Sequence, residues 1–133
     1  VVLLAMMAFT VFDNEKSQER PIHQLRIYKV PKQNIEVFHA RFRDHAHRIM
    51  KKYEFKIVSM WESRMDDTVE FVYLLEWKDK SQMENAWEKF MNDQEWKDIK
   101  KETSEMHGTF VESIEDRILI LADYSPQTQQ LKQ

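Results

Sequence analysis

The chain has 133 residues, a formal net charge of −3, no cysteine and one glycine. This length suits one domain of ordinary size, and a charge near zero gives no electrostatic signature of a nucleic-acid-binding protein. Without cysteine there is no disulfide framework, no Cys-type zinc site, no iron–sulfur cluster and no thiol nucleophile. A single glycine excludes the glycine-rich loops that bind phosphates and dinucleotides. Most classes of cofactor-dependent enzyme are therefore excluded, and we expect no cofactor.

The two ends of the chain differ in composition from its middle. Residues 1–20 consist of a signal-like apolar segment, VVLLAMMAFTVF, followed by a polar linker. About a dozen apolar residues are too few to span a bilayer, but they match the hydrophobic region of a secretory signal. An N-terminal strand or helix that packs on the domain is the alternative. Residues 127–133 have too little apolar surface to pack and are expected to be disordered, which leaves one folded domain over 21–126.

The apolar segment also decides the expected location of the protein. If it is a signal, the protein is exported to the periplasm or secreted; otherwise the protein is cytoplasmic. Contact with a membrane is expected only through this segment, and only if it is not cleaved.

A first strand and a first helix are predicted from a change in the spacing of apolar residues along the sequence. Residues 23–30 alternate, with Arg26 and Tyr28 on one face, which predicts a strand that ends at Pro31. From Asn34, a plausible N-cap, apolar residues recur every three or four positions, which predicts an amphipathic helix. One stripe of this helix is formed by Ile35, Phe38, Phe42, His45, Ile49 and Tyr53.

A hairpin comes next. Residues 55–63 have the composition of a strand, residues 65–68 (MDDT) supply a turn, and residues 69–77 (VEFVYLLEW) form the most strongly β-like segment of the chain. The two segments are therefore expected to pair as neighbouring antiparallel strands.

Two helical segments and a last strand complete the domain. Ser81 and Glu84 have the spacing of a capping box, which predicts the start of a second helix. Asp93 is placed to cap a further helical segment, and Gly108 can end that segment in a left-handed conformation. Residues 109–121 are expected to contain the last strand.

Strand, helix, hairpin, helix and strand is the βαββαβ order of an α+β, ferredoxin-like domain with an antiparallel sheet. Its helices cover one face of the sheet, yet the strand over 69–77 is apolar on both faces, and Trp61 adds to the apolar surface. A solvated face should alternate with polar residues, so we expect a second copy to cover it and form a homodimer, a dimeric α/β barrel. We assign to the uncovered face the large side chains Phe71, Tyr73, Leu75 and Trp77.

Several short strings carry a resemblance to one known family: HQLRIY (23–28), ARFRDH (40–45), FVYLLEW (71–77), AWEKF (86–90), NDQEW (92–96) and ADYSP (122–126). In this order and at these separations they resemble the NIPSNAP family of dimeric α/β-barrel proteins. The resemblance covers nearly the whole folded unit. It implies the ferredoxin-like barrel fold but no single reaction, because the wider superfamily includes cofactor-free monooxygenases, isomerases and haem-dependent enzymes.

The chain departs from the family pattern mainly at turns. The family's Lys-Pro-Gly after the first strand is Lys-Gln-Asn here (32–34), and its customary glycines near the second strand are Glu54 and Ser59. Gln94 replaces a customary proline. None of these changes removes a reactive group.

His45 is one candidate for acid–base chemistry. It occupies the predicted apolar stripe, and histidine titrates near neutral pH, which suits a proton shuttle. A histidine at the edge of the core, bonded to a carbonyl or a carboxylate, is the alternative. His39 and His47 lie on other faces of the helix and cannot converge with His45 on a metal ion, so no metal site is expected. Haem is not expected either, because a histidine on an outer helix does not reach the barrel.

Arg26 and Tyr28 are the second candidate. If their face lines the barrel, they place a cationic donor beside a phenol, which suits an acidic or enolic small molecule. The alternative is that Arg26 pairs with a carboxylate such as Glu70 or Glu76 across the sheet and Tyr28 fills the core. Three aromatic residues form either the apolar wall of a ligand pocket or the core of the dimer: Trp61, Tyr73 and Trp77.

We therefore expect a protein that binds a small molecule or a partner without established catalysis. The enzymatic alternative is a cofactor-independent monooxygenase or isomerase for a small acidic aromatic or enolic substrate, with Arg26 holding the anion and Tyr28 or His45 moving a proton. An interaction module that displays the second helix pair is a third possibility. A cavity in the dimer of about 300 Å³ or more, lined by Arg26 and Tyr28, would favour a ligand.

Overall fold

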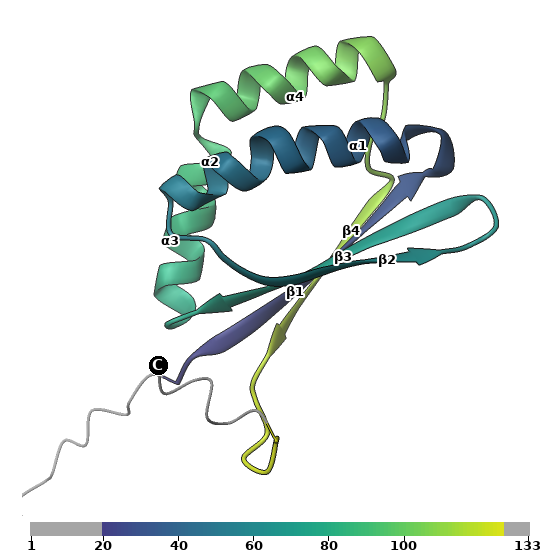
Figure 1. Ribbon diagram of the computed structural model, residues 1–133. Coiled ribbons are helices and arrows are strands. Elements are labelled where there is room, and N and C mark those ends of the chain that lie inside the picture. Colours follow the sequence, from purple (N-terminus) through teal and green to yellow (C-terminus); the bar gives the residue numbers. More distant parts are fainter. Residues whose placement is uncertain (1–19, 127–133) are drawn as a thin grey trace, which may run out of the picture.

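The strand β1 lies inside a four-stranded antiparallel sheet of order β2-β3-β1-β4. The structure is a computed structural model that describes residues 20–126 (Figure 1). The predictions made for the apolar N-terminal segment and for residues 127–133 lie outside the described residues. The strands are β1 (Ile22–Pro31), β2 (Lys56–Arg64), β3 (Thr68–Trp77) and β4 (Ser113–Leu119).

The helices all lie on one face of this sheet (Figure 1). The first helical stretch contains a wide π turn in its middle, and a second pair of helices connects β3 to β4. This order and this sheet confirm the ferredoxin-like α+β fold. The helical segments are η1 (Lys32–Asn34), α1 (Ile35–Arg41), η2 (Phe42–Ala46), α2 (His47–Lys52), α3 (Lys80–Met91) and α4 (Gln94–His107).

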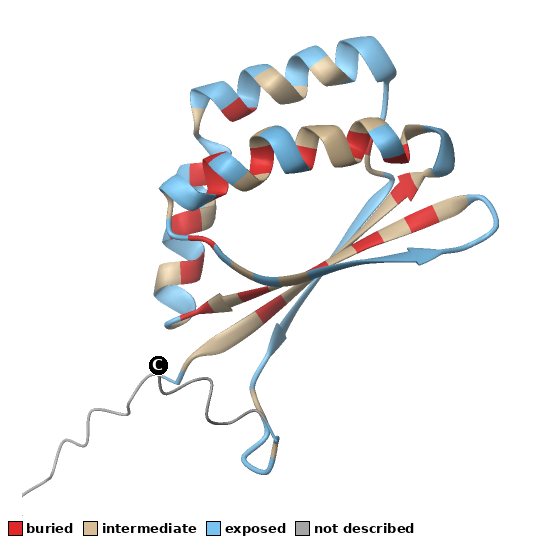
Figure 2. Ribbon diagram, in the orientation of Figure 1, coloured by how far each residue is buried: buried red, intermediate tan, exposed pale blue. Residues whose placement is uncertain are grey.

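The core lies between the sheet and these helices. Every second residue of β3 is buried, which gives the strand an alternating pattern of buried and partly exposed residues (Figure 2). The inward-facing side chains are no more than 3% exposed: Val69, Phe71, Tyr73, Leu75 and Trp77.

This burial corrects one assignment made from the sequence. The face of β3 that carries Phe71, Tyr73, Leu75 and Trp77 is covered by the chain's own helices and is not available to a second copy. Sequence alternation shows that two faces exist, but when both are apolar it does not show which of them the helices cover.

The opposite face of the sheet keeps a smaller apolar surface. In the strand register, Leu25 lies opposite Leu74, Ile27 lies opposite Val72, and Val72 also lies opposite Trp61. The four aliphatic side chains are partly exposed, and Trp61 is 51% exposed. We call these five residues the outer patch.

The helix ends agree only in part with the predicted caps. Asp93 caps α4 as predicted, because its carboxylate accepts a hydrogen bond from the backbone N–H of Trp96 at 2.9 Å. Gly108 ends α4 with a φ of 72°, which a residue without Cβ adopts at low cost. Of the other two predicted caps, Asn34 occupies the N-cap position of α1 but forms no capping bond, and Ser81 is not the N-cap of α3.

Asp79, and not Ser81, is the N-cap of α3. Its carboxylate accepts from the backbone N–H of Gln82 at 2.8 Å, and the Gln82 side chain in turn accepts from the N–H of Lys78. Asp and Gln three residues apart also match the capping pattern, so the sequence contained two overlapping signals. Asn34 makes no capping bond; its side chain donates instead to the carbonyl of Thr109 at 3.0 Å and ties the start of α1 to the segment before β4.

The helix α2 ends in a turn that places Glu54 at a φ of 66°. The backbone N–H of Glu54 bonds to the carbonyl of Lys51, and that of Phe55 bonds to the carbonyl of Met50. This is the Schellman arrangement, in which glycine is the preferred residue at the left-handed position. The exposed Glu54 therefore carries a backbone strain that a glycine would relieve.

We expect Glu54→Gly to stabilise the protein by about 0.5–1 kcal/mol, because removing Cβ relieves the left-handed strain by more than the extra chain entropy of glycine costs. Urea denaturation of the variant beside the parent protein measures this difference. Glu54→Ala is the matched control: it removes the same carboxylate but keeps Cβ, and should give no gain. Equal stabilisation by both variants would contradict the explanation.

Candidate functional site

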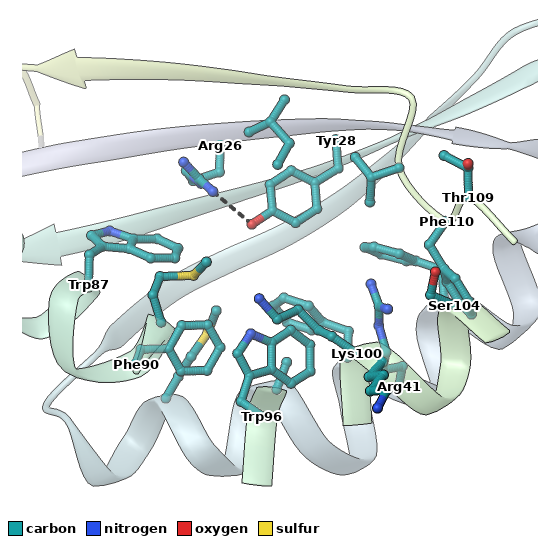
Figure 3. Close-up of a pocket in the computed structure, with 18 of the residues that line it drawn as sticks. Arg26, Tyr28, Arg41, Trp87, Phe90, Trp96, Lys100, Ser104, Thr109 and Phe110 are labelled. Carbon is teal, nitrogen blue, oxygen red and sulfur yellow. Dashed lines mark hydrogen bonds between the residues drawn. The ribbon is translucent and has the colours of Figure 1, made fainter. Parts of the chain in front are cut away.

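A cavity of about 600 Å³ lies between the inner face of the sheet and the helices (Figure 3). Arg26 and Tyr28 of β1 form part of its sheet side, and α1, η2, α2, α3 and α4 supply the other walls. Four of its lining residues are cationic, and no Asp or Glu is among the described residues that line it. Most of the remaining wall is apolar, with the aromatic side chains Phe38, Phe42, Trp87, Phe90, Trp96 and Phe110.

Arg26 is held by neighbours on both sides of its strand. The register of the sheet places it opposite Asp116 of β4 and opposite Tyr73 of β3. Its guanidinium donates to the Asp116 carboxylate at 2.9 Å and to the Tyr28 hydroxyl at 3.0 Å. Arg26 thus pairs with a carboxylate across the sheet, as one of the two interpretations of the sequence had it, but the partner is Asp116. Glu70 and Glu76 alternate with the buried residues of β3 and lie on the opposite face of the sheet.

The side chain of Arg26 is also packed against rings. Its guanidinium carbon lies 4.4 Å from the centre of the Trp87 ring and 5.2 Å from that of Tyr28. Burial by itself lowers the pKa of Arg26, but the hydroxyls of Tyr28 and Tyr73 more than offset this effect, and the net pKa is raised. Arg26 is therefore a fixed positive charge at one end of the cavity.

Gln24 is a buried polar residue that the sequence analysis did not single out. It is 2% exposed, and its amide oxygen accepts hydrogen bonds from the indole N–H groups of Trp77 and Trp87, at 2.9 and 2.8 Å. Its amide nitrogen donates to Asp116 at 3.0 Å. Gln24 therefore links the strand pair that holds Arg26 to the helix α3 that packs on it. The sequence feature that could have pointed to Gln24 is its position on the same strand face as Arg26 and Tyr28.

The hydroxyls of Tyr28 and Tyr73 lie 2.8 Å apart and share a hydrogen bond. Tyr73 is fully buried, and burial raises its pKa well above the usual value, with the neighbouring Tyr28 adding to the shift. Tyr73 thus keeps its proton at neutral pH and acts as a hydrogen-bond donor or acceptor, not as a base.

A second cationic group lies where α1 and α4 meet the segment before β4. The guanidinium carbon of Arg41 lies 4.2 Å from the ring centre of Phe110 and 5.4 Å from that of Trp96, and Lys100 Nζ lies 5.8 Å from the same Trp96 centre. Arg41 donates to the hydroxyl of Thr103 at 3.0 Å. Within residues 20–126, no carboxylate forms an ion pair with Arg41 or Lys100.

The pKa values of Arg41 and Lys100 reflect the lack of a carboxylate partner for their charges. Burial lowers the pKa of Arg41. Burial also lowers the pKa of Lys100, and the positive charges of Arg41 and Lys97 lower it further. An anion beside Arg41 and Lys100 would reverse the effect of this repulsion.

His45 does not line the cavity. The predicted stripe assumed α-helical turns, but η2 is a π turn in which the backbone N–H of His47 bonds to the carbonyl of Phe42. A π turn rotates less per residue, so the fourth residue after Phe42, Ala46, returns to the buried face and His45 does not. His45 is partly exposed, and its Nδ1 lies 3.4 Å from a guanidinium nitrogen of Arg48.

The three aromatic residues expected to form one wall are separated by the sheet. Tyr73 and Trp77 face the helices, whereas the register places Trp61 on the other face, opposite Val72. None of the three lines the large cavity. Trp61 borders a smaller cavity of about 330 Å³ together with His39, whose ring nitrogen lies 2.5 Å from the Glu62 carboxylate.

The family model described as NIPSNAP matches residues 23–126. The chain belongs to the NIPSNAP family. This confirms the resemblance found in the sequence. No curated protein matches the chain.

Solved structures of NIPSNAP proteins share this fold. A NIPSNAP family protein from Agrobacterium tumefaciens has a TM-score of 0.70 at 18% identity, over 81% of this chain and 99% of that one. An uncharacterized NIPSNAP-like domain protein from Burkholderia xenovorans has a TM-score of 0.68 at 15% identity, over 81% of this chain and 90% of that one. At such identities the likeness shows the fold alone.

In the described part of the chain, no three His, Asp or Glu side chains gather as a metal site would require. No helix within residues 20–126 is long and apolar enough to cross a membrane.

We expect Gln24→Leu to destabilise the NIPSNAP domain by about 2–4 kcal/mol, because the indole N–H groups of the buried Trp77 and the partly buried Trp87 lose their common acceptor. Thermal and urea unfolding measure the loss. Gln94→Leu is the matched control: Gln94 is exposed and bonds only to Asp98 within its own helix, so its loss should change stability by no more than about 0.5 kcal/mol. Similar effects of the two variants would show that the Gln24 bonds contribute little.

Proposed function

We propose that this NIPSNAP protein binds a small anionic molecule with an apolar, preferably aromatic, body in the cavity beneath its helices. The observation that carries the proposal is the composition of the wall: four cationic side chains and many aromatic ones, with no carboxylate among the described lining residues. Two of the cations, Arg41 and Lys100, are partly buried without a carboxylate partner among the described residues, which favours an anionic occupant, and the rings favour an apolar one.

The size of the cavity supports the same proposal. Its volume of about 600 Å³ falls within the range of small-molecule sites, and its wall combines apolar surface with a few polar groups. The cavity is formed by one chain, whereas the sequence analysis expected it between two copies. Arg26 and Tyr28 belong to it in both cases.

Catalysis by a cofactor-independent monooxygenase or isomerase remains the alternative, and no observation favours it over binding. His45, the candidate proton shuttle, lies away from the cavity wall. Tyr73, hydrogen-bonded to Tyr28, has its pKa raised by burial, which disfavours proton abstraction at neutral pH.

We expect 2-naphthoate to bind to the protein and to alter the fluorescence of Trp87 and Trp96, both of which line the cavity. Ser104→Trp should abolish this binding, because Ser104 is an exposed lining residue of α4 and an indole there fills the cavity mouth without disturbing the core. Isothermal titration calorimetry measures binding to the parent protein and to the variant, and tryptophan emission measures the change in fluorescence.

Met106→Trp is the control for this experiment. Met106 is exposed, lies on the same helix and does not line the cavity, so this variant should bind as the parent does. Absence of binding to the parent protein, or equal binding to the parent and to Ser104→Trp, would contradict a ligand site in this cavity.

We further propose that two copies associate through the outer patch and form the homodimeric barrel. The patch groups the four aliphatic side chains with Trp61 on a sheet face that no helix of the described chain covers (Figure 1). Clustered apolar residues on one exposed face are typical of a protein–protein interface, and a two-fold axis makes one patch complementary to itself.

Leu74→Arg should convert the dimer into a folded monomer, because it places a charge in the middle of the buried interface. Light scattering coupled to size-exclusion chromatography measures the mass, and circular dichroism verifies the fold. Asn85→Arg, on the exposed surface of α3, should remain dimeric. A parent protein that is a monomer at high concentration would contradict the proposal.

A further inference from the structure

The two cationic ends of the cavity differ in how their charge is balanced. At one end, Arg26 forms an ion pair with Asp116 at 2.9 Å, and Asp116 also accepts from Gln24. The positive charge of Arg26 is therefore already compensated inside the protein. A ligand carboxylate placed there would meet Asp116 as well as Arg26, and like charges would oppose its binding.

At the other end, Arg41 and Lys100 have no such partner among residues 20–126. Both groups lie within 6 Å of the centre of one ring, that of Trp96, and Arg41 bonds only to a neutral hydroxyl, that of Thr103. Figure 3 shows Arg41 beside Phe110 at this end, with Arg26 beside Trp87 at the other. A ligand anion here would gain two charge-assisted contacts without displacing an internal carboxylate.

The Arg26 end instead offers a neutral hydrogen-bond donor. Tyr73 is fully buried, and the acceptor near its hydroxyl is the oxygen of Tyr28 at 2.8 Å. Either hydroxyl could be the donor of this bond, but a buried hydroxyl proton needs an acceptor, so we assign Tyr73 as the donor to Tyr28; Arg26 donates to the same oxygen. The proton of Tyr28 is then free to bond to a ligand oxygen in the cavity.

We propose that the ligand is an aromatic acid with a hydroxyl or carbonyl oxygen at its far end, and that its carboxylate binds at Arg41 and Lys100 while that oxygen accepts from Tyr28. This rests on the proposed function of the cavity and adds the orientation and the chemical class of its ligand. Trp87, Phe90 and Trp96 contact the ring system between the two ends.

Three related probes separate the contributions of the two ends: 6-hydroxy-2-naphthoate, 2-naphthoate, which lacks the hydroxyl, and 2-naphthol, which lacks the carboxylate. Calorimetry with each probe gives their affinities for the parent protein and its variants. We expect the parent to bind the hydroxy acid most tightly and 2-naphthol most weakly.

Arg41→Gln and Lys100→Gln should each weaken the two acids by about tenfold or more, which is the usual effect of losing a charged hydrogen-bond partner, and leave 2-naphthol within about twofold. Tyr28→Phe should abolish the advantage of the hydroxy acid over 2-naphthoate and leave 2-naphthoate unchanged. Arg43→Gln makes the same change of charge at an exposed residue outside this cavity and should leave all three affinities unchanged.

The outcomes distinguish this inference from the proposal on which it rests. If none of the probes binds to the folded parent protein, the proposed function fails, and the orientation with it. If the acids bind but Arg41→Gln and Lys100→Gln leave them unaffected, while Arg26→Gln removes their advantage over 2-naphthol, the cavity is a ligand site and the orientation is overturned. Two variants on separate helices ensure that a folding defect in one does not decide the result.

Discussion

The candidate site depends on the row of polar side chains that β1 carries beneath the helices. Gln24, Arg26 and Tyr28 are neighbours on one strand face, and each bonds to a group from another strand or helix: two indoles, a carboxylate of β4 and a phenol of β3. Polar groups at the edge of an apolar core are costly unless bonded, so these contacts fix the position of β1 relative to β4 and α3. The sheet side of the cavity is as rigid as this network.

The two sides of the cavity therefore have different characters. On the sheet side the charge of Arg26 is matched by Asp116, and hydrogen bonds hold the polar atoms in place. On the helix side Arg41 and Lys100 rest on aromatic rings without a carboxylate partner among the described residues. The attraction between a cation and the π electrons of a ring partly replaces the water that the cation loses on burial. The cation therefore stays charged and can still bind an anion. This difference between the two sides would orient an anionic ligand in the cavity.

Much of the fold could be predicted from the sequence, because periods of two and of three to four residues are properties of the local chain. The family assignment and the element order were confirmed in this way. The face of β3 that the helices cover was not predictable, since both faces are apolar and the choice depends on tertiary packing. The same limit applied to the pairing of Arg26, because Asp116 lies 90 residues away and only the register of β4 places it opposite. Gln24 was missed because a single amide in a strand has no distinctive pattern, and His45 was misplaced because no composition rule marks a π turn.

That wide turn sets the phase of the whole first helical stretch. Phe38 and Arg41 before it, Ala46 at its end and Met50 after it all line the same cavity. If all residues of η2 took ordinary α geometry instead, the earlier half would rotate relative to the later half by about 100°. Arg41 would then turn away from Lys100 while the strands stayed as they are. The π turn thus decides whether the positive charges of Arg41 and Lys100, which lie on different helices, can contact the same ligand.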